Sequence, residues 1–126
     1  MENVLIVDDE ENTRIGLVKL LAQEGCHAKA VANGFEALEC LEDSDIRLIL
    51  TDINMPGMNG LVFLRELNRT YPEIKVVMIT AYGGVDSYLE AMNLGALEYL
   101  HKPVKRRDLQ AVLSKTLGHI GSQEGA

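Results

Sequence analysis

The chain has 126 residues and a formal net charge of −7, and 47% of its residues are hydrophobic while 25% are charged. This length suits one domain, and the composition is that of an ordinary globular protein rather than a disordered one. The apolar runs are far shorter than the ~20 residues of a membrane span, and the first residues do not resemble a secretory signal. The acidic balance argues against direct binding of nucleic acid or of an anionic membrane surface. We therefore expect a cytoplasmic domain with neither kind of partner.

The first half of the chain alternates between patterns typical of buried strands and patterns typical of helices. Apolar runs at 4–7 and 48–50 predict central strands covered on both faces, and a weaker alternation predicts a strand over 28–32. A helix is expected from about residue 13, with one face formed by Ile15, Val18, Leu21 and Ala22. A shorter helix follows the Asn33-Gly34 turn signal and is marked by Ala37, Leu38 and Leu41.

The second half continues the alternation. A loop containing Met55-Pro56-Gly57 leads into a helix that opens at Asn59 or Gly60 and closes before Pro72. The inward residues of this helix are expected to be Leu61, Leu64 and Leu67. Residues 76–79 predict a fourth strand and residues 98–101 a short fifth one. The helix between them is marked by Val85, Tyr88, Leu89 and Met92, and the last helix by Leu109, Val112, Leu113, Leu117 and Ile120.

Five strand–helix units with short connections predict an α/β fold built on a parallel sheet. Helical crossovers between parallel strands are right-handed, and they cover both faces of such a sheet. No repeat or compositional break divides the chain. We expect one domain over residues 1–120, followed by a flexible tail or the start of a linker at 121–126.

Polar side chains follow four of the five predicted strands. Asp8 and Asp9 follow the first strand, Asp52 the third, Thr80 the fourth and Lys102 the fifth. Because the carboxyl ends of parallel strands share one edge of the sheet, we expect three carboxylates, a hydroxyl and an ammonium group to converge there. Each residue alone could be structural, for instance as a helix cap. Their joint occurrence favours a site.

The chemistry of such a cluster suits a divalent cation and a phosphoryl group. Carboxylates held together repel one another, and Mg²⁺, which prefers oxygen ligands, relieves the repulsion. A carboxylate beside such an ion and a lysine can be the nucleophile that forms an acyl phosphate.

The whole pattern resembles the receiver domain of response regulators in bacterial two-component signal transduction systems. The resemblance covers about residues 3–118 and is carried by Asp8-Asp9, Asp52 with Met55-Pro56 and Gly60, Thr80-Ala81, Gly95-Ala96 and Lys102-Pro103. It implies a doubly wound, flavodoxin-like (βα)5 fold with strand order 2-1-3-4-5. It also implies a phosphorylation-controlled switch, and not a conventional turnover enzyme.

The resemblance implies a role for each site residue. Asp52 would accept a phosphoryl group from a sensor histidine kinase or a phosphotransfer domain. Asp8 and Asp9, with Asp52 and the backbone carbonyl of Asn54, would hold Mg²⁺, for which Mn²⁺ can substitute. Lys102 would pair with the phosphoryl oxygens, and the bond from Lys102 to Pro103 should be cis. Hydrolysis of the aspartyl phosphate would reset the switch.

The resemblance also implies how the signal leaves the site. Thr80 would move to the phosphoryl group, and Tyr99 would turn inward with it. The surface of the fourth helix, fifth strand and last helix would change, and a homodimer or a fused effector domain could use that surface. Asn54 and Tyr82, each two positions after a site residue, would set the phosphoryl lifetime. Val104 stands where many relatives have Phe.

Three other readings are weaker on the sequence. A phosphatase acting on external substrates would want a second acid where Asn54 stands, and an inserted cap. A flavodoxin-type protein would want a phosphate-cradling loop where Asp8 and Asp9 stand. Nothing argues for an interaction domain with a vestigial site. The basic cluster of Lys102, Lys105, Arg106 and Arg107 is interpreted as a solvated helix start or a docking contact rather than a nucleic-acid patch.

Overall fold

The computed structural model describes residues 3–81 and 83–117, and these residues form a five-stranded parallel sheet with strand order β2-β1-β3-β4-β5. The strands are β1 (Val4–Val7), β2 (Ala28–Val31), β3 (Leu48–Asp52), β4 (Lys75–Thr80) and β5 (Glu98–His101). The helices are α1 (Glu11–Gln23), α2 (Gly34–Leu41), α3 (Gly60–Thr70), α4 (Val85–Asn93) and α5 (Arg106–Thr116). The predicted fold class and strand order are confirmed. No helix of the described part is long and apolar enough to cross a membrane.

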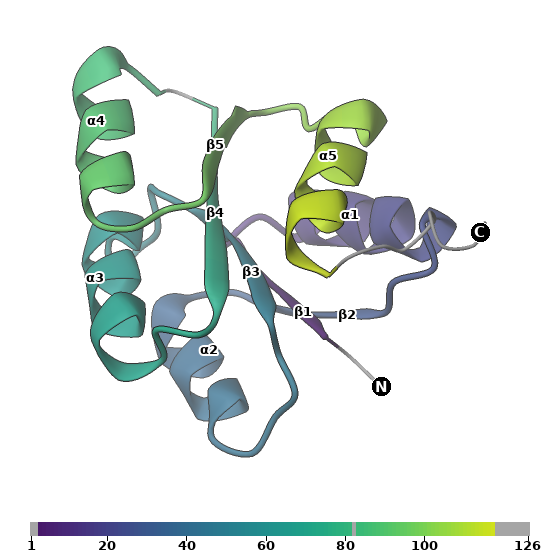
Figure 1. The fold of residues 1–126 in the computed structure, drawn as a ribbon, viewed down its shortest axis with the longest axis horizontal. Helices are drawn as coiled ribbons and strands as arrows, with labels where there is room; N and C mark the ends of the chain where they lie inside the picture. The colour runs from purple at the N-terminus through teal and green to yellow at the C-terminus, as the bar shows by residue number, and fades with distance from the viewer. Residues whose placement is uncertain (1–2, 82, 118–126) are drawn as a thin grey trace.

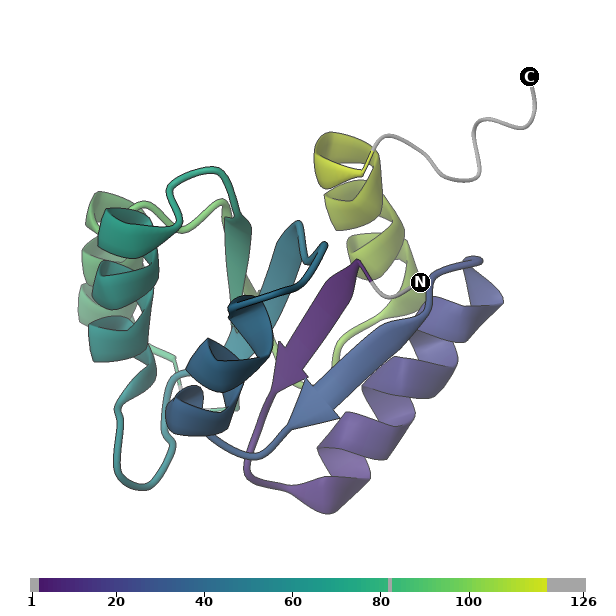
Figure 2. The ribbon, with the colours of Figure 1, turned by 90° about the horizontal axis from the view of Figure 1, so that it is seen from below.

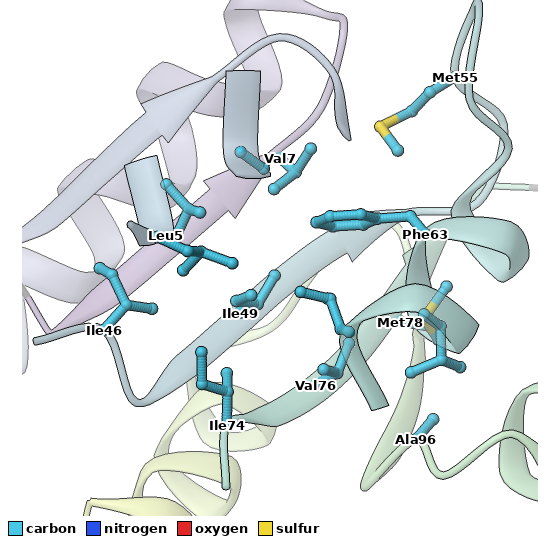
Figure 3. Packing of buried hydrophobic residues seen from close by; sticks show 14 of the residues in the cluster. Leu5, Val7, Ile46, Ile49, Met55, Phe63, Ile74, Val76, Met78 and Ala96 are labelled. Carbon is cyan, nitrogen blue, oxygen red and sulfur yellow. The ribbon is translucent and has the colours of Figure 1, made fainter. Parts of the chain in front are cut away.

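The helices cover both faces of the sheet. Helices α2, α3 and α4 lie on one side, and α1 and α5 lie on the other (Figures 1 and 2). Alternate residues of each central strand point to opposite faces, so Leu5 packs with the first group of helices and Ile6 with the second. Figure 3 shows the first of these two clusters, in which Phe63 of α3 lies over the sheet. Burial on both faces explains why these strands are continuous apolar runs.

Helix α1 buries a face that matches the predicted one only in part: Leu21 is buried and Val18 packs half-buried against the core, as predicted. Ile15 is 46% exposed and Ala22 is exposed, while Leu17 and Leu21 are buried against the sheet and α5. Two neighbouring stripes of this helix are apolar, and a period of 3.6 residues cannot distinguish them. The packed stripe is the one that carries the leucines.

Helix α4 exists where its pattern predicts it, but most of that pattern faces outward. Val85 is 73% exposed, Tyr88 45% and Leu89 53%. Ala91 is the residue of this helix that is fully buried, and Met92 is half-buried. The exposed side chains of Val85, Tyr88 and Leu89 are called the α4 stripe below.

Asparagine caps begin two of the helices. The Asn33 side chain accepts a hydrogen bond from the backbone N–H of Glu36 at 2.9 Å, and the Asn59 side chain accepts one from that of Leu61 at 2.7 Å. These bonds satisfy donors that the first helical turn leaves unpaired.

Most predicted boundaries hold to within one or two residues. β2 ends one residue earlier than predicted, whereas β3 and β4 run on to include Asp52 and Thr80. Helix α1 begins at Glu11, two residues early. Helix α5 is described to Thr116, and the predictions for Ile120 and for 121–126 lie outside the described residues.

Candidate functional site

The sheet register places the ends of the central strands side by side. Val7 pairs with Thr51, Asp52 with Ile79, and Thr80 with His101. The residues that end or follow these strands therefore meet at one edge, as the sequence predicts. This convergence needs no particular loop conformation, because it follows from the parallel pairing itself.

Three carboxylates gather at this edge. Asp8, Asp9 and Asp52 each offer an oxygen atom, and these atoms all lie within 4.8 Å of one another. Asp8 is 1% exposed and Asp52 is 7% exposed, while Asp9 is exposed. The cluster is thus open to solvent from the side of Asp9 and closed beneath.

Backbone groups hold the two buried carboxylates in place. One oxygen of Asp52, Oδ1, accepts hydrogen bonds from the N–H groups of Ile53 at 2.7 Å and Asn54 at 3.3 Å. Asp8 Oδ1 accepts a bond from the N–H of Glu10 at 2.9 Å. Arg14 of α1 donates to the Asp8 carbonyl at 2.7 Å, which ties the strand end to the following helix.

Lys102 supplies the positive charge of the cluster. Its ammonium nitrogen lies 2.8 Å from Asp8 Oδ2, 3.3 Å from Asp52 Oδ2 and 3.8 Å from Glu10 Oε1. Burial opposes the charged form, but the hydrogen bond to Asp8 and the two buried carboxylates outweigh it and raise the pKa of Lys102. The peptide bond between Lys102 and Pro103 is cis, as predicted.

Asp52 is held in an environment that disfavours its charge. Burial raises the pKa of this carboxyl, Lys102 opposes the rise, and the charge of Asp8 adds to it. The folded chain therefore binds the proton of Asp52 more tightly than the unfolded chain does. At a pH above the folded-state pKa of Asp52, its ionised carboxylate lowers the free energy of unfolding. This cost disappears once the pH is below the pKa of an aspartic acid in the unfolded chain, about 3.9.

We expect Asp52→Asn to stabilise the chain in EDTA at pH 7, by about 0.5–2 kcal/mol, because the amide keeps the shape of the side chain without its charge. The gain should shrink as the pH falls toward 4. Urea unfolding at several pH values measures it, with the exposed Asp43→Asn as the matched control. A lower stability of Asp52→Asn at pH 7 would show that the charge is not the dominant cost.

The start of α3 approaches the end of β3 more closely than a side chain would allow. The N–H of Gly60 donates to the Ile53 carbonyl at 2.7 Å. A Cβ atom at Gly60 would lie 2.6 Å from Ile53 Cα and nearer still to the Asp52 carbonyl oxygen. Glycine is therefore required here by space, and this contact sets the backbone beneath the Asp52 carboxylate.

The predicted site residues fall into three groups. Asp8, Asp9, Asp52 and Lys102 are brought together, and Thr80 ends the strand next to β3, fully buried. The Asn54 side chain is exposed, and its backbone reaches Asp52. Tyr99 lies within β5, where it pairs with Met78, and Tyr82 lies outside the described residues.

Sequence reasoning missed two residues at this edge. Glu10 lies within 4 Å of Lys102, and Arg14 binds the backbone of Asp8. The run of four acids at 8–11 was a signal for Glu10, but it did not show which carboxylates would turn toward the lysine.

The donor set fits a hard divalent cation. All three clustered acids offer carboxylate oxygens, the ligands that Mg²⁺ prefers, and no histidine or cysteine of the described residues joins them as a ligand. The solvent-facing Asp9 leaves room for the water molecules that Mg²⁺ usually keeps. The residues present are therefore consistent with a metal site.

Comparisons with known proteins agree with this geometry. Residues 4–114 match the family described as response regulator receiver domain. The chain is 33% identical to the DNA-binding transcriptional regulator NtrC of Escherichia coli K12 over 121 residues, which is 96% of the chain and 26% of that protein. It is 38% identical to the transcriptional regulatory protein ZraR of Klebsiella oxytoca over 122 residues, 97% of the chain and 28% of that protein. The chain thus spans about a quarter of the length of these curated relatives.

Solved structures show the same likeness. A CheY-like receiver domain protein from Methanospirillum hungatei superposes with a TM-score of 0.84 at 30% identity, covering 91% of this chain and 92% of that one. The receiver domain of NtrX from Brucella abortus gives a TM-score of 0.83 at 32% identity, covering 89% and 95%. With this fold and an acidic cluster at the ends of its parallel strands, the chain belongs to the family of response regulator receiver domains.

Proposed function

We propose that Asp52 accepts a phosphoryl group from a phosphohistidine and that the chain works as a signalling switch. One observation carries this proposal: a buried carboxylate, oriented by two backbone N–H groups, faces a lysine and lies within 4.8 Å of two further carboxylates. As a receiver domain, the chain is a phosphoacceptor rather than a conventional enzyme. The family implies a histidine kinase as partner, and the phosphohistidine could also come from a phosphotransfer domain.

The transfer step follows from the placement of Asp52. A carboxylate oxygen of Asp52 attacks phosphorus, the phosphorus–nitrogen bond breaks, and its electron pair returns to the imidazole. Lys102 is placed to stabilise the charge on the phosphoryl oxygens. A Mg²⁺ ion held by Asp8, Asp9, Asp52 and the Asn54 carbonyl would neutralise charge on the transferring group, and Mn²⁺ could replace it. Water then cleaves the acyl phosphate, which restores the carboxylate and releases inorganic phosphate.

The signal leaves through the side of the sheet that carries α4 and β5. Phosphorylation adds about −1.5 to −2 charge and three acceptor oxygens. The hydroxyl of Thr80 would move toward them, and Tyr99 would follow. The α4 stripe is the exposed apolar surface next to this path, and we propose that α4, β5 and α5 form the surface that docks a partner or a second copy of this chain.

The other finer assignments rest on the family. We propose that residues 1–120 form the receiver domain and that 121–126 lead into a linker or end as a flexible tail. The relatives are much longer and are transcriptional regulators by name, so we propose that the signal passes to an effector domain fused to this one. Asn54 and Tyr82 would control how easily water reaches the acyl phosphate. Phosphohistidine donors of this kind are cytoplasmic, so we place the reaction in the cytoplasm.

Phosphorylation can be tested with a small donor in place of the kinase. Incubation with acetyl phosphate and Mg²⁺ should add one phosphoryl group, seen by intact mass. Asp52→Asn and addition of EDTA should each abolish the gain, whereas Asp43→Asn, which removes an exposed acid, should leave it unchanged. A wild-type chain that gains nothing, or an Asp52→Asn variant that still gains the group, would overturn the proposal.

A further inference from the structure

The hydroxyl group of Tyr99 on β5 is bonded to the first turn of α4. Ser87 and Tyr99 lie twelve positions apart in the chain, and their hydroxyl groups form a hydrogen bond. The Ser87 hydroxyl also donates to the Gly84 carbonyl at 3.3 Å. Either hydroxyl group can be the donor of the bond between Ser87 and Tyr99. A side-chain hydrogen bond thus joins Tyr99 of β5 to Ser87 of α4.

Gly83 allows Tyr99 to lie against the loop that follows Thr80. A Cβ atom at Gly83 would be 2.8 Å from Thr80 Cγ2 and 2.9 Å from Cε1 of the Tyr99 ring, and it would be nearer still to the Tyr99 hydroxyl. The threonine methyl, the glycine and the tyrosine ring therefore occupy one small space. A shift of Thr80 changes the room available to Tyr99, because these groups are already close.

The Tyr99 ring is also linked to the α4 stripe. It meets the ring of Tyr88 edge to face, with centroids 5.5 Å apart, and the ring of His101 at 5.6 Å. Of the other residues of α4, Ala91 is fully buried and Met92 packs half-buried against the same core. Because so little apolar packing holds α4, the bond from Ser87 and the contact from Tyr88 are a large part of what joins this helix to β5.

We propose that Ser87 is a positioning residue that makes Tyr99 and α4 move as one unit. This inference rests on the proposed function, since it concerns how a change at Thr80 reaches the α4 stripe. With the bond in place, a new position of the Tyr99 ring pulls the first turn of α4 with it. Without the bond, the ring can change position while α4 stays where it is.

The bond itself is tested in the unphosphorylated chain by hydrogen exchange. Ser87→Ala should speed exchange of the α4 amides about fivefold, the effect of one lost hydrogen bond. Ser87→Thr, which keeps the hydroxyl, should not. In a Tyr99→Phe background, which already lacks the bond, Ser87→Ala should add little. Equal effects of Ser87→Ala in both backgrounds would overturn the proposal, because only the Gly84 contact would then matter. Ser114→Ala, on the exposed side of α5, is the matched control.

The coupling is tested after phosphorylation with acetyl phosphate and Mg²⁺. Ser87→Ala should still gain one phosphoryl group by mass. In NMR spectra of the variant labelled with fluorotyrosine, the fluorine signal of Tyr99 should still shift on phosphorylation. The chemical-shift changes of the α4 backbone amides should be at least twofold smaller than in wild type, and Ser87→Thr should restore them. Full α4 shifts in Ser87→Ala would overturn the inference. A wild-type chain that gains no phosphoryl group would instead contradict the proposed function. The hydrogen-exchange experiment would still show whether the Ser87 bond stabilises α4.

Discussion

Lys102→Ala should slow phosphorylation by acetyl phosphate about 10²–10³-fold. The ammonium group is ion-paired with the carboxylates of both Asp8 and Asp52, at 2.8 and 3.3 Å, and its removal would leave the charge that develops on a phosphoryl group at Asp52 without this partner. Losses of this size are typical when one electrostatic donor of a reaction site is removed. The time course of the mass gain, in saturating Mg²⁺, measures the effect.

The same variant should also be less stable without metal. Asp8 and Asp52 would keep their burial but lose their shared partner, at a cost of about 1–3 kcal/mol in urea unfolding with EDTA. Mg²⁺ should restore part of this loss, because it binds the folded state. Lys105→Ala removes an exposed lysine three positions away and should stay within twofold of the wild-type rate. A Lys102→Ala variant that reacts as fast as wild type would remove Lys102 from the transfer step.

Gly60→Ala should lower the free energy of unfolding by about 3 kcal/mol or more. The added Cβ would meet backbone on the opposite side, at Asp52 and Ile53, and backbone cannot rotate away as a side chain can. The strain acts directly beneath the Asp52 carboxylate, the proposed acceptor, so phosphorylation should slow about 10²-fold even where the variant remains folded. Urea unfolding and the rate of mass gain measure the two effects separately.

Gly16→Ala is the matched control for this change. A Cβ atom at Gly16 would meet nothing within 4 Å, and the residue lies in the interior of α1. Alanine is the better helix former there, so stability should rise by about 0.5–1 kcal/mol. Equal effects of the two substitutions would show that the close approach at Gly60 is not what matters.

The sequence predicts this fold well because the fold depends on a repeating local pattern. Strand runs such as Val4–Val7 are short, apolar and separated by helical periods, and parallel pairing then places Asp8, Asp52 and Lys102 at one edge whatever the loops do. The predicted inward face of α1 was right for Leu21 and wrong for Ile15, since Ile15 and Leu17 are both apolar and only tertiary packing decides between them.

The contacts around the carboxylate cluster join residues that are far apart in the sequence, so no local sequence pattern predicts them. The carboxylate of Glu10 turns toward Lys102, which is more than ninety residues away, and Ser87 meets Tyr99 across the gap between a helix and an edge strand. The space that excludes a Cβ at Gly60 is likewise set by how α3 packs on β3. Such contacts appear only once the layers are assembled.

The outward placement of the α4 stripe has a thermodynamic consequence. A helix that buries one alanine fully and one methionine in part loses little buried apolar surface when it tilts, slides or frays, so rearranging it requires only a small fraction of the free energy that would unfold the whole chain. A single negatively charged group at the edge of the sheet can supply that much. The sheet and the other four helices can therefore remain rigid while α4 alone changes position.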